Sequence, residues 1–143
     1  MIMNEFYDMK ENEVLVPEGK EQTDAKGVKI FLVSDMHFDH ENIIKYCNSP
    51  FKSKDEMNNV MIGNWNSVVG NSDTIYILGD VTFGRGHKPI DYWMDKLKGN
   101  KFLIKGNHDK DKLIKATKIA NETILEYSGW KFLLMHEPKR PTN

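Results

Sequence analysis

Three continuous apolar runs place the strongest constraint on the fold, because none of them alternates cleanly between apolar and polar residues. The runs are KIFLVSD at residues 29–35, TIYILGD at 74–80 and KFLIKGNHD at 101–109. Runs of this kind are typical of strands that are covered on both faces, as they are in a parallel sheet. We therefore expect an α/β protein with three such strands at its centre.

Two helical patterns separate these runs. The first has Ser53 as its N-cap, Glu56 three residues later and Gly70 as its stop. Its stripe comprises Met57, Val60, Met61, Asn64, Trp65 and Val68. The second pattern, at 88–100, begins near Pro89, and its apolar face comprises Ile90, Trp93, Met94 and Leu97. Both patterns predict helices that cross over between parallel strands.

The segments after the third run follow a different plan. Residues 109–121 predict a shorter helix. Residues 123–138 predict two strands, because an apolar stretch is interrupted by the turn residues Ser128 and Gly129. We expect the chain to finish with a β-hairpin.

The N-terminal segment differs in charge from the remainder of the chain. Residues 1–27 contain three lysines against seven aspartates and glutamates, and they show no sustained period. We expect them to form an acidic extension with one short strand near 14–16, and residues 28–143 to form one folded domain. A chain of 143 residues with 39% hydrophobic residues is long enough to bury a core.

The composition favours a cytoplasmic protein. Cys47 is the only cysteine, so no intramolecular disulfide can form, which fits a reducing compartment. The first residues lack the basic start and apolar run of a signal peptide, and no window approaches the ~18 apolar residues of a membrane span. A formal net charge of -1 provides no basic field for nucleic acid or an anionic membrane.

Polar residues with metal-binding side chains follow the ends of four apolar runs. These runs finish as FLVSDMH, YILGD, FLIKGNHD and FLLMHEP. The carboxyl ends of parallel strands lie along one edge of a sheet, where ligands bind, so we expect these residues to converge. Four of the five histidines lie within a few residues of such an end: His37, His40, His108 and His136. We interpret His87 as an ordinary loop histidine.

The residue types favour metal ions over other chemistry. Ser34 precedes a carboxylate inside a strand and Cys47 lies on a predicted helix, so neither fits a catalytic triad. The strands are not followed by a glycine-rich phosphate loop, and a thiolate zinc site needs more cysteines. Carboxylate, imidazole and amide oxygen together suit two divalent ions such as Mn²⁺, Fe²⁺ or Zn²⁺. Two such ions ~3.5–4 Å apart would clamp a phosphate and activate water.

These motifs resemble a known signature. The calcineurin-like metallophosphoesterases carry a similar set, here Asp35-x-His37, Gly79-Asp80, Gly106-Asn107-His108-Asp109 and a later His136. The stretch SDMHFDHENIIKYC, followed by Pro50-Phe51, resembles small bacterial and phage members of that superfamily. The resemblance runs from about Lys29 to Pro138. It implies an α/β/β/α fold, in which a β-sheet sandwich core is flanked by helices.

The resemblance also implies a metal centre. Asp80 would bridge two divalent ions, of which Mn²⁺ is preferred and Fe²⁺, Zn²⁺ or Ni²⁺ are alternatives. The first ion would be held with Asp35 and His37, and the second with Asn107 and His136. A hydroxide bridging the two ions would attack a phosphodiester or phosphomonoester in line.

Four further residues receive roles around that centre. His108 would protonate the leaving oxygen, with Asp109 orienting its ring. His40 is equally well explained as a substrate contact or as an ordinary loop histidine, and Arg85 is a weaker candidate for a phosphate contact. In this subgroup an arginine often precedes the Pro-Phe pair, whereas Ser49 stands there in this chain. The same centre serves nucleases and phosphomonoesterases, and no basic stripe with interleaved aromatic residues favours a polynucleotide.

The chain departs from the family pattern at its C-terminal end. It stops at HEPKRPTN, before the Gly-His-x-His segment whose histidines complete both ions. Each ion would therefore be one protein ligand short. Three explanations are open: a C-terminally incomplete domain from a longer reading frame, which we favour; a natural short form that binds metal weakly; or a phosphate-binding or interaction module without turnover.

Overall fold

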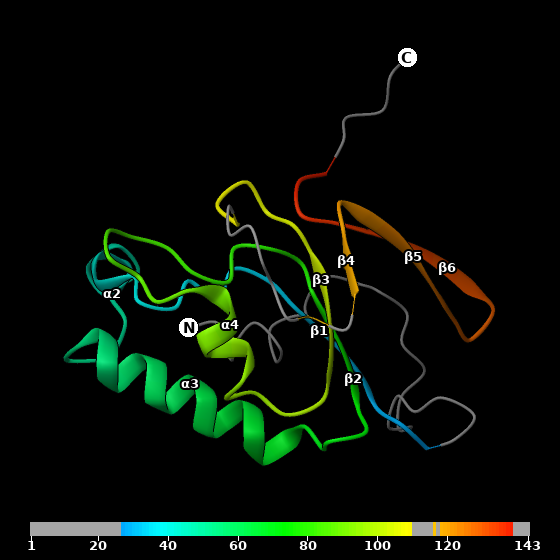
Figure 1. Ribbon diagram of the computed structural model, residues 1–143, viewed down its shortest axis with the longest axis horizontal. Helices are drawn as coiled ribbons and strands as arrows, with labels where there is room; N and C mark the ends of the chain where they lie inside the picture. The colour runs from blue at the N-terminus through cyan, green and yellow to red at the C-terminus, as the bar shows by residue number, and fades with distance from the viewer. Residues whose placement is uncertain (1–26, 110–115, 117, 139–143) are drawn as a thin grey trace.

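A four-stranded parallel sheet forms the centre of the computed structural model, which describes residues 27–109, 116 and 118–138 (Figure 1). The strands lie in the order β1-β2-β3-β4, and their bounds are Ile30–Val33, Thr74–Ile77, Asn100–Ile104 and Lys118–Ala120. The first three strands coincide with the three apolar runs, which confirms that prediction. The strand expected near 14–16 lies outside the described residues.

Strand β4 replaces the end of an expected helix. Residues 118–120 pair with 102–104 of β3, and the Lys105 amide donates to the Ala120 carbonyl at 2.9 Å. The helix predicted for 109–121 is therefore wrong at its C-terminal end, while 110–115 and 117 lie outside the described residues. The weak local helical preference is overridden here because pairing satisfies the backbone groups along the free edge of β3.

The long helix α3, Lys54–Val68, begins as predicted. The Ser53 hydroxyl accepts from the Glu56 amide at 3.2 Å, and the Glu56 carboxylate accepts from the Lys52 amide at 2.7 Å. Its buried residues are Met57, Asn58, Met61 and Trp65. Val60 and Val68 of the predicted stripe are 40% and 52% exposed, so the buried face is rotated toward Asn58.

The two other helices are short. Helix α2, Glu41–Tyr46, follows β1, and Cys47 is its C-cap. Helix α4, Ile90–Met94, is shorter than the pattern at 88–100 predicts. The expected apolar face is nevertheless buried as a whole: Ile90, Trp93, Met94 and Leu97. None of the helices in the described residues is long and apolar enough to cross a membrane.

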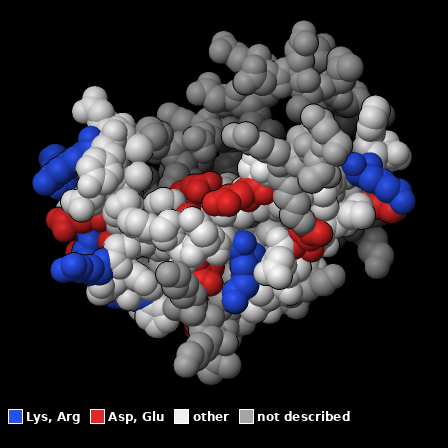
Figure 2. All heavy atoms as spheres, turned by 90° about the horizontal axis from the view of Figure 1, so that it is seen from above, with Lys and Arg blue, Asp and Glu red and all other residues white. Residues whose placement is uncertain are grey.

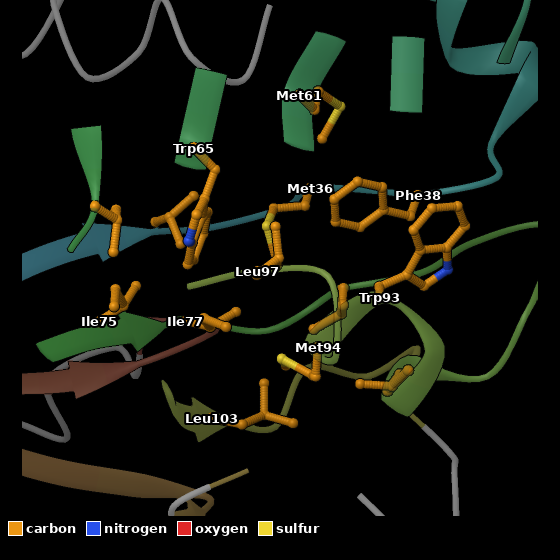
Figure 3. Packing of buried hydrophobic residues seen from close by; sticks show 14 of the residues in the cluster. Met36, Phe38, Met61, Trp65, Ile75, Ile77, Trp93, Met94, Leu97 and Leu103 are labelled. Atoms are coloured by element: carbon orange, nitrogen blue, oxygen red, sulfur yellow. The ribbon is translucent and has the colours of Figure 1, made fainter. Parts of the chain in front are cut away.

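The main core lies between the helices and one face of the sheet (Figure 3). Alternate residues of the strands point into it, among them Val33, Ile77 and Leu103. The rings of Phe38 and Trp93 stack with their centroids 4.5 Å apart, which joins the loop after β1 to α4. This packing holds the loop after β1, which carries Asp35 and His37, against α4.

The opposite face of the sheet is covered by a hairpin made of β5, Glu122–Tyr127, and β6, Trp130–Met135. Leu125 and Leu134 are buried there together with Ile104. Ser128 and Gly129 have φ of 52° and 83°, and positive values at both central residues are the pattern of a type I′ turn. The hairpin is confirmed. It forms a separate antiparallel sheet, so only three of the four polar ends belong to parallel strands.

Candidate metal centre

The loops that follow β1, β2 and β3 meet at the upper edge of the sheet in Figure 1. The amides of Asp35 and His37 donate to the carbonyls of Gly79 and Asp80, both at 3.1 Å, and hold the first two loops side by side. Figure 2 looks down on this edge, and acidic side chains gather near its middle. The convergence expected from the strand ends is thus present in the structure.

Two glycines allow the second and third loops to touch. A Cβ placed on Gly79 would lie 2.7 Å from the Cα of Gly106 and 2.6 Å from Nδ1 of His136. A Cβ placed on Gly106 would overlap Oδ1 of Asp80 and lie 2.6 Å from its backbone nitrogen. Contacts this short are excluded for real side chains, so both positions require glycine.

Several side chains at this edge are carried by a backbone in the left-handed region. The φ angles are 53° at Asp35, 50° at His37, 66° at Asp39 and 53° at Asp80. A residue with a side chain pays about 1–3 kcal/mol for such a conformation, and such residues cluster at functional sites. The hydrogen bonds between the loops overcome this cost, and the bends aim the polar side chains at one another.

Asp80 lies at the centre of the group and is 4% exposed. Its Oδ2 is 3.7 Å from Nε2 of His37, while its Oδ1 is 3.6 Å from Nε2 of His136. These separations are too long for hydrogen bonds but shorter than twice a typical metal–ligand distance of about 2.1 Å. One cation can therefore contact both members of each pair, and the two oxygens of Asp80 face different histidines.

The two ring nitrogens of His136 have different partners. Nδ1 lies 2.7 Å from the Leu78 carbonyl, to which it donates, and this leaves Nε2 as the free nitrogen beside Asp80. Nε2 also lies 3.2 Å from Oδ1 of Asn107. Burial lowers the pKa of His136, but the Leu78 carbonyl and the carboxylates of Asp80, Asp35 and Glu137 outweigh it, so the pKa is raised.

The structure brings the predicted ligands together at this edge of the sheet. Ligand atoms of Asp35, Asp80 and His136 all lie within 4.8 Å of one another and form a group that can hold a cation. Nε2 of His37 is 3.6 Å from Oδ1 of Asp35, so His37 lies beside the same group. The donor set of carboxylates, imidazoles and a nearby amide oxygen suits a divalent ion of intermediate hardness.

His108 and Asp109 occupy different environments. The side chain of His108 is 41% exposed, and its Nε2 lies 3.9 Å from Oδ2 of Asp80. Asp109 is buried, and its carboxylate accepts from the backbone amides of Asp80 at 2.8 Å, Val81 at 3.0 Å and Gly106 at 2.9 Å. The contacts described for this carboxylate are with backbone rather than with the ring of His108. Asp109 therefore fastens two loops together, a role the sequence did not suggest.

The two candidate substrate contacts are placed very differently. His40 is 7% exposed, and its Nδ1 lies 3.2 Å from Nδ1 of His37. Burial, followed by the nearby imidazoles of His37 and His108, lowers the pKa of His40. Arg85 is exposed in the turn at 84–86, and among the described residues no hydrogen bond or ion pair joins it to the site.

Phe83 is the residue that the sequence did not reveal. Its ring centroid lies 5.4 Å from that of His37 and 4.4 Å from those of His40 and His108. The amide of Phe83 donates to the Phe38 carbonyl at 3.1 Å, which fixes the ring beside the three histidines. A single phenylalanine in a glycine-containing loop gives no sequence signal for this position.

The chain is similar in sequence to two proteins and in structure to a third. The uncharacterized protein MJ1445 of Methanocaldococcus jannaschii is 43% identical over 113 residues, which are 77% of this chain and 59% of that protein. The gene 66 protein of Mycobacterium phage L5 is 35% identical over 81 residues, or 55% of this chain and 39% of that protein. The crystal structure of the protein of unknown function AQ665 from Aquifex aeolicus matches with a TM-score of 0.62 and 35% identity, covering 80% of this chain and 63% of that one.

The chain spans less than two thirds of the length of each of these three proteins. The family model for calcineurin-like phosphoesterases matches residues 28–140, which include every residue of the candidate site. A match of the family model over most of the chain establishes the family. This chain belongs to the calcineurin-like phosphoesterases.

Proposed function

We propose that this chain hydrolyses phosphoester bonds with two divalent metal ions, of which Mn²⁺ is the preferred species. The observation that carries the proposal is the position of Asp80, whose oxygens face His37 on one side and His136 on the other. A carboxylate placed in this way can bridge two cations. The family match supports the same class of reaction.

The ligands would be contributed by three loops and the end of the hairpin. The first ion would be held by Asp35, His37 and Asp80, and the second by Asp80, Asn107 and His136. Bound divalent ions neutralise the charge of a phosphoryl group and lower the pKa of water at the site.

The chain's own residues would complete the reaction. His108 is exposed at the rim of the group and close to Asp80, where an imidazolium can contact a phosphate and give a proton to the leaving oxygen. Asp109 would act through the backbone, because it holds the loop of Asp80 against the loop of His108. Removal of either residue would thus affect turnover for different reasons.

Hydrolysis of bis-(p-nitrophenyl) phosphate tests the proposal directly. The purified chain is freed of metal with a chelator and assayed with and without Mn²⁺, beside Asp80→Asn and the control Asp55→Asn at an exposed position on the first turn of α3. We expect Mn²⁺-dependent turnover in the parent and the control and its loss in Asp80→Asn. Phosphate binding without turnover at any Mn²⁺ concentration would favour a binding module instead.

The same assay separates two classes of substrate. Phosphodiesters carry one negative charge on the phosphoryl group, whereas monoesters carry up to two and need a more strongly cationic pocket. We propose neither class ahead of the other. The ratio of kcat/KM for bis-(p-nitrophenyl) phosphate and p-nitrophenyl phosphate decides between them.

A further inference from the structure

The side chains of His37 and His40 face each other through the same ring nitrogen, Nδ1 to Nδ1, at 3.2 Å. We propose that His40 is a positioning residue, which fixes the ring and the tautomer of His37 for metal binding and does not contact the substrate. The inference rests on the proposed metal-binding function. It replaces the substrate contact that the sequence allowed for His40.

Only one arrangement of protons makes this contact useful. A neutral imidazole has one N–H donor and one acceptor nitrogen, so a hydrogen bond between the two Nδ1 atoms requires that one of them donates to the other. If His37 donates from Nδ1, its Nε2 carries a lone pair toward the carboxylates of Asp35 and Asp80. If His40 donates instead, Nε2 of His37 carries the proton and a cation is excluded. The proposal therefore assigns His40 the role of acceptor.

The position of His40 is itself firmly held. Its amide donates to the His37 carbonyl at 3.1 Å, and its side chain is largely buried. Although His40 is the N-cap residue of α2, its side chain makes no capping hydrogen bond. The ring of His40 therefore does not bond to the first backbone amides of α2, and its described hydrogen bond is with His37.

Phe83 and Asp39 both restrict the movement of this pair. The ring of Phe83 stacks on His37 at an interplanar angle of 24° and packs on His40 with centroids 4.4 Å apart. The carboxylate of Asp39 accepts from Nδ2 of Asn58 at 3.1 Å and from the Lys88 amide at 2.8 Å. These bonds tie the residue before His40 to α3 and to the loop that carries Phe83. Rotation of either imidazole is resisted by fixed neighbours.

Two substitutions of His40 by amide side chains test whether an acceptor atom at the position of Nδ1 is what His37 requires. His40→Asn keeps an oxygen on Cγ, at the place of Nδ1, and can accept from His37. His40→Gln carries its polar atoms one carbon farther out, near the place of Nε2. His87→Asn is the matched control, because His87 lies in the loop at 84–88 and its described side-chain contact is with the Lys88 carbonyl.

The first readout is Mn²⁺ affinity, measured by titration of each metal-free protein. Loss of an outer partner of a metal-binding histidine lowers metal affinity by about 10- to 100-fold. We expect His40→Gln to lose at least 10-fold, while His40→Asn and the His87 control stay within about threefold of the parent. Equal affinity in His40→Gln and the parent overturns the proposal, and so does equal loss in His40→Asn and His40→Gln.

The second readout is the tautomer of His37 in the metal-free protein, from long-range ¹⁵N–¹H correlation spectra. We expect the proton on Nδ1 in the parent and in His40→Asn, and a shift of the proton toward Nε2 in His40→Gln. A proton on Nε2 of His37 in the parent would overturn the proposal. The proposed function can fail independently of this inference. Mn²⁺ binding without hydrolysis would contradict the proposed catalysis but not the role of His40. Unchanged Mn²⁺ affinity in Asp80→Asn would contradict the metal site itself.

Discussion

The carboxylate of Asp109 accepts a hydrogen bond from the backbone nitrogen of Asp80 at 2.8 Å, although these residues follow different strands. The same oxygen, Oδ2, also accepts from the Gly106 amide, and Oδ1 accepts from the Val81 amide. One buried side chain thus fixes the backbone position of Asp80, whose carboxylate lies between His37 and His136. Asp109 therefore helps to set the geometry of the site by joining the two loops.

Replacing Asp109 by alanine is expected to damage folding and metal binding together. The change leaves three backbone amides without their partner, and each unsatisfied buried donor costs about 1–3 kcal/mol. The free energy of unfolding in urea should fall by about 3 kcal/mol or more, with a weaker Mn²⁺ titration. Asp109→Asn retains an acceptor oxygen, so its free energy of unfolding should lie between those of the parent and Asp109→Ala. Unchanged stability with reduced turnover would return Asp109 to the role of orienting His108.

The bridging position of Asp80 predicts an asymmetry in metal content. Asp80→Ala should weaken both ions, because one oxygen faces each of the two histidines. His37→Ala should chiefly weaken one, since its Nε2 faces Asp35 and a single oxygen of Asp80. Metal counting after dialysis against dilute Mn²⁺ measures the difference. Equal losses from the two variants would contradict the bridge.

The exposed position of His108 predicts a loss of turnover with little loss of metal. His108→Ala should reduce kcat by about 10²- to 10⁴-fold, the usual contribution of a general acid. The reduction should be smallest for a nitrophenyl ester, whose leaving group needs little protonation, and largest for an alkyl ester. Since Nε2 lies only 3.9 Å from Asp80, metal counting on the same variant is the essential control. Loss of bound metal would identify His108 as a ligand.

Two glycines form a matched pair for testing the contact between loops. Gly106→Ala should destabilise the fold and empty the metal site, because the new Cβ would overlap the carboxylate of Asp80. Gly63→Ala, within α3, has nothing within 4 Å of the new Cβ and should raise the free energy of unfolding by up to about 1 kcal/mol. Thermal denaturation and Mn²⁺ titration of both variants check this. A harmless Gly106→Ala would show that the loops can separate without loss of the site.

Features that depend on local chemistry were predictable from the sequence. Ser53 starts α3 by a hydrogen bond to a residue three positions away, and Ser128 with Gly129 closes a hairpin through their own backbone angles. The parallel strands were equally readable, since their continuous apolar character follows from coverage on both faces. The meeting of Asp35 and Asp80 then follows from the rule that parallel strands end at one edge.

Features that depend on distant partners were not predictable. Asn58 is turned inward in place of Val60 because it exchanges two hydrogen bonds with Asp39, nineteen residues earlier. Strand β4 forms because β3 offers an open edge, and its sequence alone favours a helix. Phe83 reaches three histidines only through the path of its loop. In each case the deciding interaction joins segments that are distant in the sequence, and a local sequence pattern does not indicate that they meet.

The left-handed bends at Asp35, His37 and Asp80 also bear on the thermodynamics of ion capture. Because hydrogen bonds between the protein's own loops hold these bends, we expect the conformational entropy cost of shaping the site to fall on folding rather than on association. An arriving cation then exchanges its hydration shell for a preorganised set of oxygen and nitrogen donors. The affinity of such a site would depend on the dehydration and charge of the cation, so we expect divalent ions to be ranked by their preference for oxygen and nitrogen donors.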